Sequence, residues 1–315
     1  PFKNHAGYEH HRSCIMKTKE RKLMQENKIY KESKLDNYEE KRKKVSFFHL
    51  TSDIFFSKVM EDLQACQEVI QILTEQKLTV KKVKTQYSIR NMENRSVILD
   101  VLAEDESGRI VNIEMHPKED EDHVRRVRYH LSSIDMSFLE KGTSYDTIPE
   151  VYLIYITERD FIGENRGINE VERIVKRSGK RIDNGVHELY VNFSGKTDSA
   201  EQQELLSYMV NSDSNYKTEI FPNLVKRVKL FKEKKEGINI MCDIIDRERA
   251  EGKAEGKAEV IALIRRKYQK QNTPEQAAEA LELEIDYVRK VMNMIAADED
   301  QSNEAIALQL LREEM

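Results

Sequence analysis

Two acidic residues, Asp100 and Glu114, interrupt two short apolar runs that are rich in β-branched residues. An Asp-Glu-Ser-Gly segment between the runs is typical of a tight turn, so the stretch from Ser96 to His116 predicts an antiparallel hairpin. A carboxylate inside a buried strand costs several kcal/mol unless it is paired or binds a cation. Whether the two acids form one site therefore depends on the register of the hairpin.

In a hairpin centred on Ser107, Asp100 stands directly opposite Glu114. Opposed residues have Cβ atoms roughly 4.5–5.5 Å apart on one face, and His116 shares the face of Glu114 because strand side chains alternate. Like charges this close repel each other, and a divalent cation resolves the conflict. Mg²⁺ typically takes one or two carboxylates plus water and phosphate oxygens. A slipped register, or a sheet edge whose acids point into solvent, stays open as the alternative.

Composition limits the class of protein. Of the 315 residues, 35% are charged and 39% hydrophobic, and the net charge is −5, so any nucleic-acid contact depends on a local basic face. The three cysteines lie far apart, which argues against the usual zinc spacing and a disulfide framework and suits a reducing compartment. No apolar run reaches the roughly 18–20 residues that span a bilayer. We therefore expect a cytoplasmic protein with no membrane partner.

Changes in charge and in apolar content along the chain predict four segments. Residues 1–44 hold 13 Lys and Arg against 7 Asp and Glu, which predicts a basic, mobile N-terminal arm, with a DNA-binding arm as the alternative. Residues 45–199 form the predicted core, and residues 200–249 a helical extension. Residues 250–315 hold a Gly-repeat helix and a region that resembles a helix-turn-helix.

Within the core, apolar periodicity predicts helices that begin near Thr51 and run on toward Lys77, then a strand over Val80–Ile89 and the hairpin. A helix follows over Glu119–Lys141, with Val124, Val127, Leu131, Ile134 and Phe138 on its apolar face and with His123 and His130 at the surface. Strands are predicted at Val151–Ile156 and His187–Phe193. This order predicts an α/β fold in which helices pack on a mixed sheet.

The C-terminal region carries two further patterns. Ala250–Glu259 is a tandem four-residue repeat with Gly252 and Gly256, and each glycine costs about 1 kcal/mol relative to alanine in a helix. The repeat predicts either a surface for homo-oligomer formation or a flexible hinge. Thr273 and Pro274 predict a helix start. Because acids outnumber the cations of the second helix, we favour structural or partner-binding use of this region over base reading.

The arrangement Asp100, thirteen intervening residues and then Glu114-x-His116 resembles the PD-(D/E)xK nuclease motif. An ordered set of landmarks resembles, more specifically, the recombination-promoting nuclease and transposase-associated branch of that superfamily. These landmarks are Ser52-Asp53-x-x-Phe56, Leu99–Asp105, Asn112–Met115, Arg126-x-Arg128-Tyr129, Lys141-Gly142 and Tyr145. The resemblance covers roughly residues 46–260. It implies a mixed-sheet, restriction-endonuclease-like core followed by a helical C-terminal region.

The resemblance also implies an activity, namely a metal-dependent endodeoxyribonuclease, a hydrolase that acts in transposition or DNA recombination. The expected cofactor is Mg²⁺, with Mn²⁺ as an alternative, and the expected partner is DNA. Asp100 and Glu114 would bind the metal and form the catalytic set with His116. The family usually places Lys or Gln at the position of His116. A histidine there would accept a proton from water, ligate a softer metal, or mark lost activity.

Four other residues are candidates for the site. Asp53 is either a further site acid or a carboxylate that the helix dipole favours at a helix start. Arg126, Arg128 and Tyr129 either contact DNA phosphates or serve as solvated and core residues of their helix. The alternative function is a catalytically inactive nuclease-fold protein that binds DNA or protein, and a weaker alternative is an assembly protein built on the Gly repeat.

Overall fold

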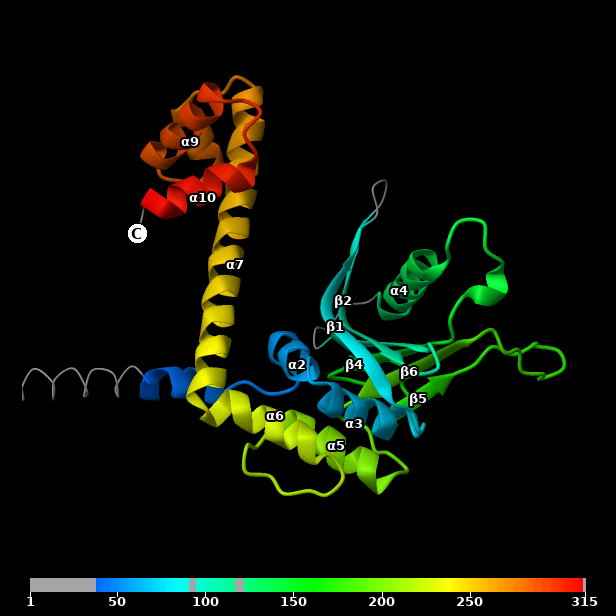
Figure 1. Cartoon of the computed structure of the whole chain (residues 1–315). Helices are drawn as coiled ribbons and strands as arrows, with labels where there is room; N and C mark the ends of the chain where they lie inside the picture. Colours follow the sequence, from blue (N-terminus) through cyan, green and yellow to red (C-terminus); the bar gives the residue numbers. More distant parts are fainter. Residues whose placement is uncertain (1–37, 91–94, 117–121, 314–315) are drawn as a thin grey trace, which may run out of the picture. The chain divides into compact units, whose positions relative to one another are not determined.

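The structure is a computed structural model that describes residues 38–90, 95–116 and 122–313 (Figure 1). Six strands form one mixed sheet in the order β1-β2-β3-β4-β6-β5. The strands are β1 Val80–Ile89, β2 Val97–Asp105, β3 Ile110–His116, β4 Val151–Thr157, β5 Ile168–Val171 and β6 Val186–Asn192. The predicted α/β fold with a mixed sheet is confirmed, and β5 was not predicted.

The central strand of the sheet is β4. All seven of its residues are buried, as expected for a continuously apolar run, and it pairs in parallel with β3 and β6. The pairs β1–β2, β2–β3 and β5–β6 are antiparallel. Leu153 and Tyr155 of β4 pack with Val127 of helix α4 (His123–Phe138) on one face of the sheet.

Helices cover the other face of the sheet and the edge at β1 (Figure 1). Helices α2 and α3 contact β1, and α3 also packs against α5 and α6. Asp62 caps α3 by accepting hydrogen bonds from the amides of Gln64 and Ala65. The bounds are α2 Asp53–Met60, α3 Leu63–Thr74, α5 Ala200–Asn211 and α6 Pro222–Glu233, and a 3-10 turn η1 spans Tyr145–Thr147. The sheet and its two helical layers form the scaffold for the acidic hairpin.

The β2–β3 hairpin has the register that the sequence predicts. The pairs run from Val101–Ile113 to Glu104–Ile110, which is the register of a hairpin centred on Ser107. The turn forms because Asp105 accepts hydrogen bonds from the Ser107 and Arg109 amides. Gly108 takes a φ of 85°, which a glycine adopts without strain. The position of Asp100 opposite Glu114 therefore follows from this register.

The chain divides into two compact units, one up to Asn239 and one from Ile240 onward. Residues 38–46 of the first unit are helical, with Tyr38 Oη donating to the Glu233 carbonyl oxygen and Lys41 Nζ to Asn239 Oδ1, each at 3.0 Å. Residues 1–37 of the predicted arm lie outside the described residues, as does the predicted start of the next helix at Glu119. The predicted segment boundary at residue 250 falls inside the second unit.

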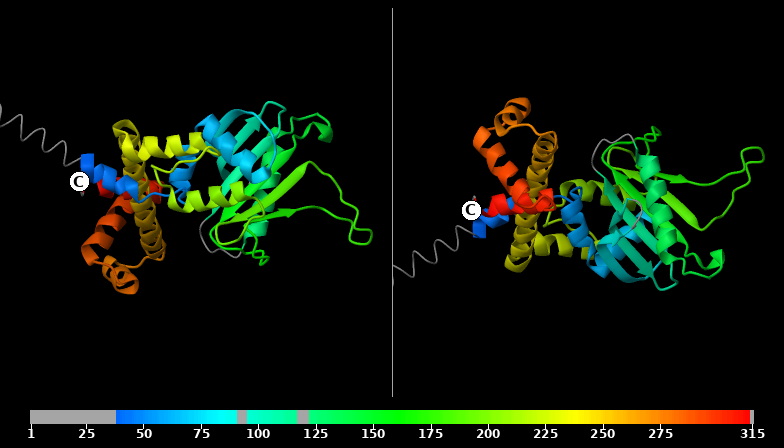
Figure 2. Two further views of the ribbon diagram at one scale, coloured as in Figure 1. Left: turned by 90° about the horizontal axis from the view of Figure 1, so that it is seen from below. Right: turned by 90° about the horizontal axis from the view of Figure 1, so that it is seen from above.

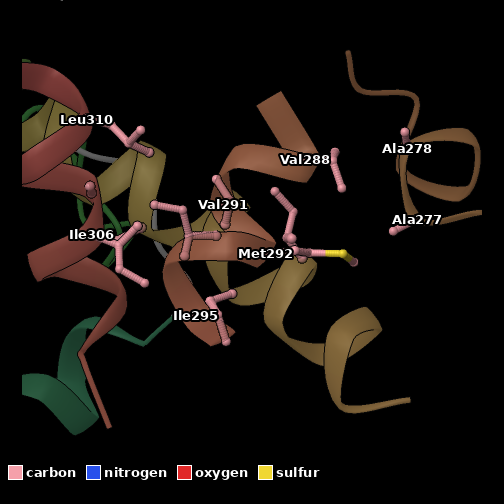
Figure 3. Close-up of a cluster of buried hydrophobic side chains, with 12 residues drawn as sticks. Ala277, Ala278, Val288, Val291, Met292, Ile295, Ile306 and Leu310 are labelled. Carbon is pink, nitrogen blue, oxygen red and sulfur yellow. The ribbon is translucent and has the colours of Figure 1, made fainter. Parts of the chain in front are cut away.

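Helix α7 (Lys235–Gln269) runs through the Gly repeat without interruption. It is followed by α8 (Pro274–Leu281), α9 (Ile285–Ala297) and α10 (Asn303–Glu313). These helices and the end of α7 share one apolar cluster, shown in Figure 3, which includes Val291 and Ile306. The predicted helix start at Thr273 is confirmed, since its hydroxyl accepts from the Gln276 amide in a capping box. None of the described helices combines the length and apolarity needed to cross a membrane.

Candidate active site

Asp100 lies where β2 and β3 stop pairing. The backbone ladder between the two strands ends at Val101 and Ile113. Beyond it, the Asp100 carboxylate accepts a hydrogen bond from the Met115 amide, with 2.9 Å between Oδ2 and N. A side-chain oxygen thus replaces a backbone carbonyl as the acceptor for β3, and the regular ladder ends at the level of the two predicted acids.

The other oxygen of Asp100 faces β1, where Gln86 stands opposite it in the β1–β2 register. Gln86 Nε2 donates to Asp100 Oδ1 at 3.2 Å and to Ser57 Oγ at 3.0 Å, so one side chain connects β1, β2 and α2. The φ of Gln86 is 49°, a left-handed value that is rare for a non-glycine residue within a strand. Backbone strain of this kind costs about 1–3 kcal/mol and clusters at functional sites.

Glu114 is buried beneath α4, with 6% of its surface exposed. The fully buried Asn112 donates from Nδ2 to Glu114 Oε1 at 2.7 Å and to the Val101 carbonyl oxygen at 3.1 Å. His130 of α4 brings its Nδ1 to 3.4 Å from the same carboxylate oxygen. Glu114 is therefore held both by its own strand and by the helix above it.

The two carboxylates influence each other electrostatically. Burial raises the pKa of Asp100 to about 7, and the negative charges of Glu114 and Asp53 contribute in the same direction. Hydrogen bonds from Met115 and Gln86 oppose this shift without cancelling it. One acid from α2 and one from β3 thus lie within electrostatic reach of Asp100 on β2. This crowding of negative charge is the environment in which a cation is stabilised.

Asp53 is the first residue of α2, and its side chain is exposed. Its Oδ1 accepts a hydrogen bond from the Ile54 amide at 2.7 Å, which is how an acid at a helix start satisfies an otherwise free amide. The same residue acts on the pKa of Asp100. Asp53 thus has a contact that fits each of its two sequence interpretations. It accepts a hydrogen bond at the start of α2, and its charge reaches Asp100.

His116 follows Glu114 by two residues at the end of β3, and it packs within a group of rings. Its ring lies 5.8 Å from the ring of Tyr155 in a stacked arrangement and 5.5 Å from that of His123 in an edge-on one. His123 Nδ1 lies 3.1 Å from Tyr155 Oη. The side chain of His116 is half-buried. The rings of His116, His123 and Tyr155 therefore form one packed group at the end of β3.

The three predicted DNA-contacting residues of α4 lie in different surroundings. Arg126 is half-buried and lies one helical turn before His130, on the side of α4 that faces the sheet. Arg128 is exposed and lines a cavity of about 480 Å³ together with Asp135. Tyr129 donates its hydroxyl to the Arg95 carbonyl oxygen at 2.5 Å. Of the three, Arg126 is therefore the one that shares a helix face with His130, the residue that contacts Glu114.

The surface positions predicted for His123 and His130 were wrong. Both are buried, at 8% and 9% exposure, whereas Val124, which was predicted to face the core, is 57% exposed. The helix is rotated from the predicted face, and its buried stripe runs through His123, Val127, His130 and Ile134. These four residues follow one another at helical intervals of four, three and four positions, which the sequence shows. A search for apolar residues alone misses this stripe because two of its members are histidines.

A divalent cation fits this set of side chains. The donors are carboxylate oxygens, the ligands that Mg²⁺ and Mn²⁺ prefer. Among the described residues, Asn112 Oδ1 is buried without a hydrogen-bond partner, and the buried His130 Nδ1 has the Glu114 carboxylate 3.4 Å away. No three His, Cys, Asp or Glu side chains form a ready-made metal cluster in the described part of the chain. Two carboxylates would therefore leave most coordination positions to water and substrate.

A mixed sheet with helices on both faces and two acids on one of its hairpins is consistent with a PD-(D/E)xK-like core. Residues 63–209 match the family described as PD-(D/E)XK nuclease family transposase. This match covers slightly less than half of the chain, and it confirms for that segment the family that the sequence landmarks predict, with a nuclease-type function at the level of the family. Comparisons with curated proteins and with solved structures gave no significant match.

Proposed function

We propose that this protein is a metal-dependent DNA endonuclease of the transposase type, which hydrolyses phosphodiester bonds at the end of the β2–β3 hairpin. The observation that carries the proposal is the placement of Asp100 where the hairpin ladder ends, opposite Glu114 in the register of the hairpin. Two acids in such proximity are unfavourable without a cation. Membership of the nuclease family in this part of the chain supports the same reaction.

The roles follow from the contacts of each residue. Asp100 and Glu114 would hold the cation, and Asn112 fixes Glu114 while Gln86 fixes Asp100. A cation in this position supplies an acidified water and neutralises charge on the phosphate. In its neutral form, His116 would accept a proton on a ring nitrogen. Asp53 is the additional acid whose charge reaches the site.

One observation favours the alternative, in which the nuclease fold binds DNA or protein without cleaving it. His116 stands where the family usually has Lys or Gln, and its ring packs against Tyr155 and His123. A ring held by its neighbours is less able to approach a water molecule than a long, mobile side chain. The variant His116→Lys separates the two cases, because activity that appears only in this variant means that the remaining site is intact.

The test is nicking of supercoiled plasmid DNA in Mg²⁺ or Mn²⁺ by the wild-type chain, Asp100→Asn and Glu114→Gln. The matched control is Glu106→Gln, which changes an exposed acid in the turn of the same hairpin. We expect a loss of about 10²–10³-fold or more for the two site variants and no loss for the control. Nicking that persists in both site variants would exclude the proposed site. No nicking by the wild-type chain in either metal would favour the inactive binding module.

A further inference from the structure

A narrow two-stranded ribbon projects from the sheet between β5 and β6, and we call residues 171–184 the basic ribbon. It is visible in Figure 2 as the long green hairpin. All fourteen residues are exposed, yet the hairpin is regular. The Ile182 amide donates to the Arg173 carbonyl oxygen at 2.9 Å, and the Val175 amide donates to the Lys180 carbonyl oxygen at 2.8 Å.

The ribbon is strongly cationic although the chain as a whole is acidic. It holds five Lys and Arg residues and two acids, within a chain whose net charge is −5. One cation, Arg181, is neutralised by Glu172 at 2.9 Å. Lys176, Arg177 and Lys180, at and beside the tip, form no ion pair with any residue that the structure describes. The tip therefore presents positive charge to the solvent.

The two faces of the ribbon differ. Ile174 pairs with Arg181 across the ribbon, so alternation places both acids on the face of this pair. The opposite face holds Arg173, Val175, Lys180 and Ile182 and carries no acid. Val175 and Ile182 on that face are 38% and 50% exposed. Ile174 on the acidic face is also exposed, at 59%, so the absence of acids is what distinguishes the second face. An isolated two-stranded ribbon is marginally stable in water, and an acid-free cationic face fits a surface that a polyanion covers.

We propose that the basic ribbon binds duplex DNA by entering a groove, with its cations on the phosphates. A two-stranded ribbon has the size that the major groove admits. The evenly spaced phosphates of a polyanion match the cluster of Lys176, Arg177 and Lys180 at and beside the tip, and a second copy of the chain is the competing occupant that the test distinguishes. The inference rests on the proposed function in one respect: DNA is the substrate there, and the ribbon would be a second contact with it.

The ribbon and the acidic pair lie toward opposite ends of the sheet. Val186, which follows the ribbon, is level with Ile110 through the parallel pairs with β4, whereas Glu114 lies four residues further along β3. At 3.3 Å per residue this offset is roughly 13 Å, and the ribbon extends roughly 20 Å beyond it. The sum is close to one turn of B-DNA. The ribbon would therefore contact the duplex about one turn from the cleaved bond. It would contribute to the affinity for DNA and not to the catalytic step.

The test is the binding of the full-length chain to a fluorescein-labelled 30-base-pair duplex, measured by anisotropy in EDTA across a salt series. The variant is Lys176→Gln/Arg177→Gln/Lys180→Gln. The control is Lys253→Gln/Arg266→Gln/Lys270→Gln, which neutralises three exposed cations of α7 and its C-terminal end. Each lost phosphate contact reduces the slope of log K against log salt by about 0.9.

We expect the slope of the ribbon variant to be about 2.7 less steep than that of the wild type, with weaker binding at low salt and an unchanged slope in the control. Val175→Thr/Ile182→Thr, which keeps every charge, should weaken binding without changing the slope. Equal slopes for ribbon variant and wild type overturn the inference. A molecular mass that falls in the ribbon variant while DNA binding stays unchanged also overturns it, in favour of a second copy of the chain.

Plasmid nicking by the same variant separates this inference from the proposed function. If the wild type binds with a ribbon-dependent slope and does not nick, the endonuclease proposal fails and the ribbon inference stands. If the wild type nicks DNA and the ribbon variant binds DNA as well as the wild type does, the ribbon inference fails and the endonuclease proposal stands. For an active enzyme we expect the ribbon variant to raise KM for DNA and to leave kcat unchanged.

Discussion

Each end of the β2–β3 hairpin contains an acid, the half-buried Asp100 at the open end and the buried Asp105 at the turn, and the two acids have different surroundings. Asp105, at the turn, is 2% exposed and is surrounded by donors, including Arg109 Nε at 2.7 Å. Burial acts to raise the pKa of Asp105, but hydrogen bonds from Ser107 and Arg109 outweigh it and hold the pKa below its usual value. Asp100, at the open end, has a pKa raised to about 7.

The contrast separates an acid whose charge the chain compensates from an acid whose charge it does not. Asp105 is compensated within the chain, so its charge stabilises the turn. Asp100 receives two hydrogen bonds, but it faces the like charges of Glu114 and Asp53. A buried charge without full compensation destabilises the folded state and persists where it serves a ligand or a reaction. The same strand pair thus contains a stabilising carboxylate and a costly one.

The largest expected effect is that of Asp100→Asn on activity and stability together. We expect nicking to fall about 10²–10³-fold or more, while the melting temperature without metal at pH 8 rises, because the substitution removes an unfavourable charge. Activity and differential scanning fluorimetry on the same samples check this. A lower melting temperature at that pH would mean that Asp100 is compensated as Asp105 is, and the contrast would fail.

Asp105→Asn should have the opposite signature. Removing the carboxylate leaves Arg109 without its partner and weakens the turn, so we expect a loss of about 2 kcal/mol in the free energy of unfolding. Urea denaturation measures this loss, and nicking per folded molecule should be kept. The variant Arg109→Met breaks the same pair from the other side. If both variants unfold at the wild-type urea concentration, the turn does not depend on this pair.

The pH dependence of stability should differ in sign between the two acids. Asp100 has a raised folded pKa, so its contribution to stability is fully present below its unfolded pKa near 3.9 and is lost as the pH rises toward about 7. Asp105 has a lowered folded pKa, so its contribution is present above the unfolded pKa and is lost as the pH falls through the folded one. Differences between wild-type and variant melting temperatures from pH 3 to 8 check both signs. If the melting-temperature differences of the Asp100 and Asp105 variants change with pH in the same direction, the two acids do not differ in the way proposed.

The smallest expected effect concerns Gln86, which connects Asp100 to Ser57. Gln86→Ala should reduce nicking about tenfold, in the range found when groups that orient metal ligands are removed, and should raise the Mg²⁺ concentration needed for half-maximal rate. Gln86→Gly is the matched variant, because glycine accepts the positive φ without strain. Equal loss in both variants assigns the effect to the missing amide. Loss in Ala alone assigns it to the backbone.

Much of this fold could be predicted because the relevant signals are local. Strand β1 coincides with Val80–Ile89, where Val83, Thr85, Tyr87 and Ile89 alternate with other residues. The Asp-Glu-Ser-Gly turn fixes the hairpin register, and the first six residues of β4 are apolar without interruption. Strand β5 was missed because Ile168–Val171 is four residues long and half polar. Its identity as a strand depends on pairing with β6, which no local pattern encodes.

The candidate site could be predicted only in part. The placement of Asp100 opposite Glu114 followed from the turn, whereas the partners of each acid come from distant elements. Gln86, Asn112 and His130 are brought to the carboxylates by strand register and by the rotation of α4. A rotation of one helical position decides whether His130 or its neighbour faces the sheet, and sequence periodicity does not resolve this. These residues carry no motif of their own.

The bond from the Met115 amide to the Asp100 carboxylate makes the end of β3 responsive to the state of the site. Any event that changes the charge on that carboxylate also changes the strength with which one backbone proton is retained. Deuterium uptake at this single amide would therefore follow ion binding in a protein that has no tryptophan to report on it. The Asp100 carboxylate is in this way also part of the pairing between two strands, so the charge state of the proposed site and fraying of the hairpin are coupled.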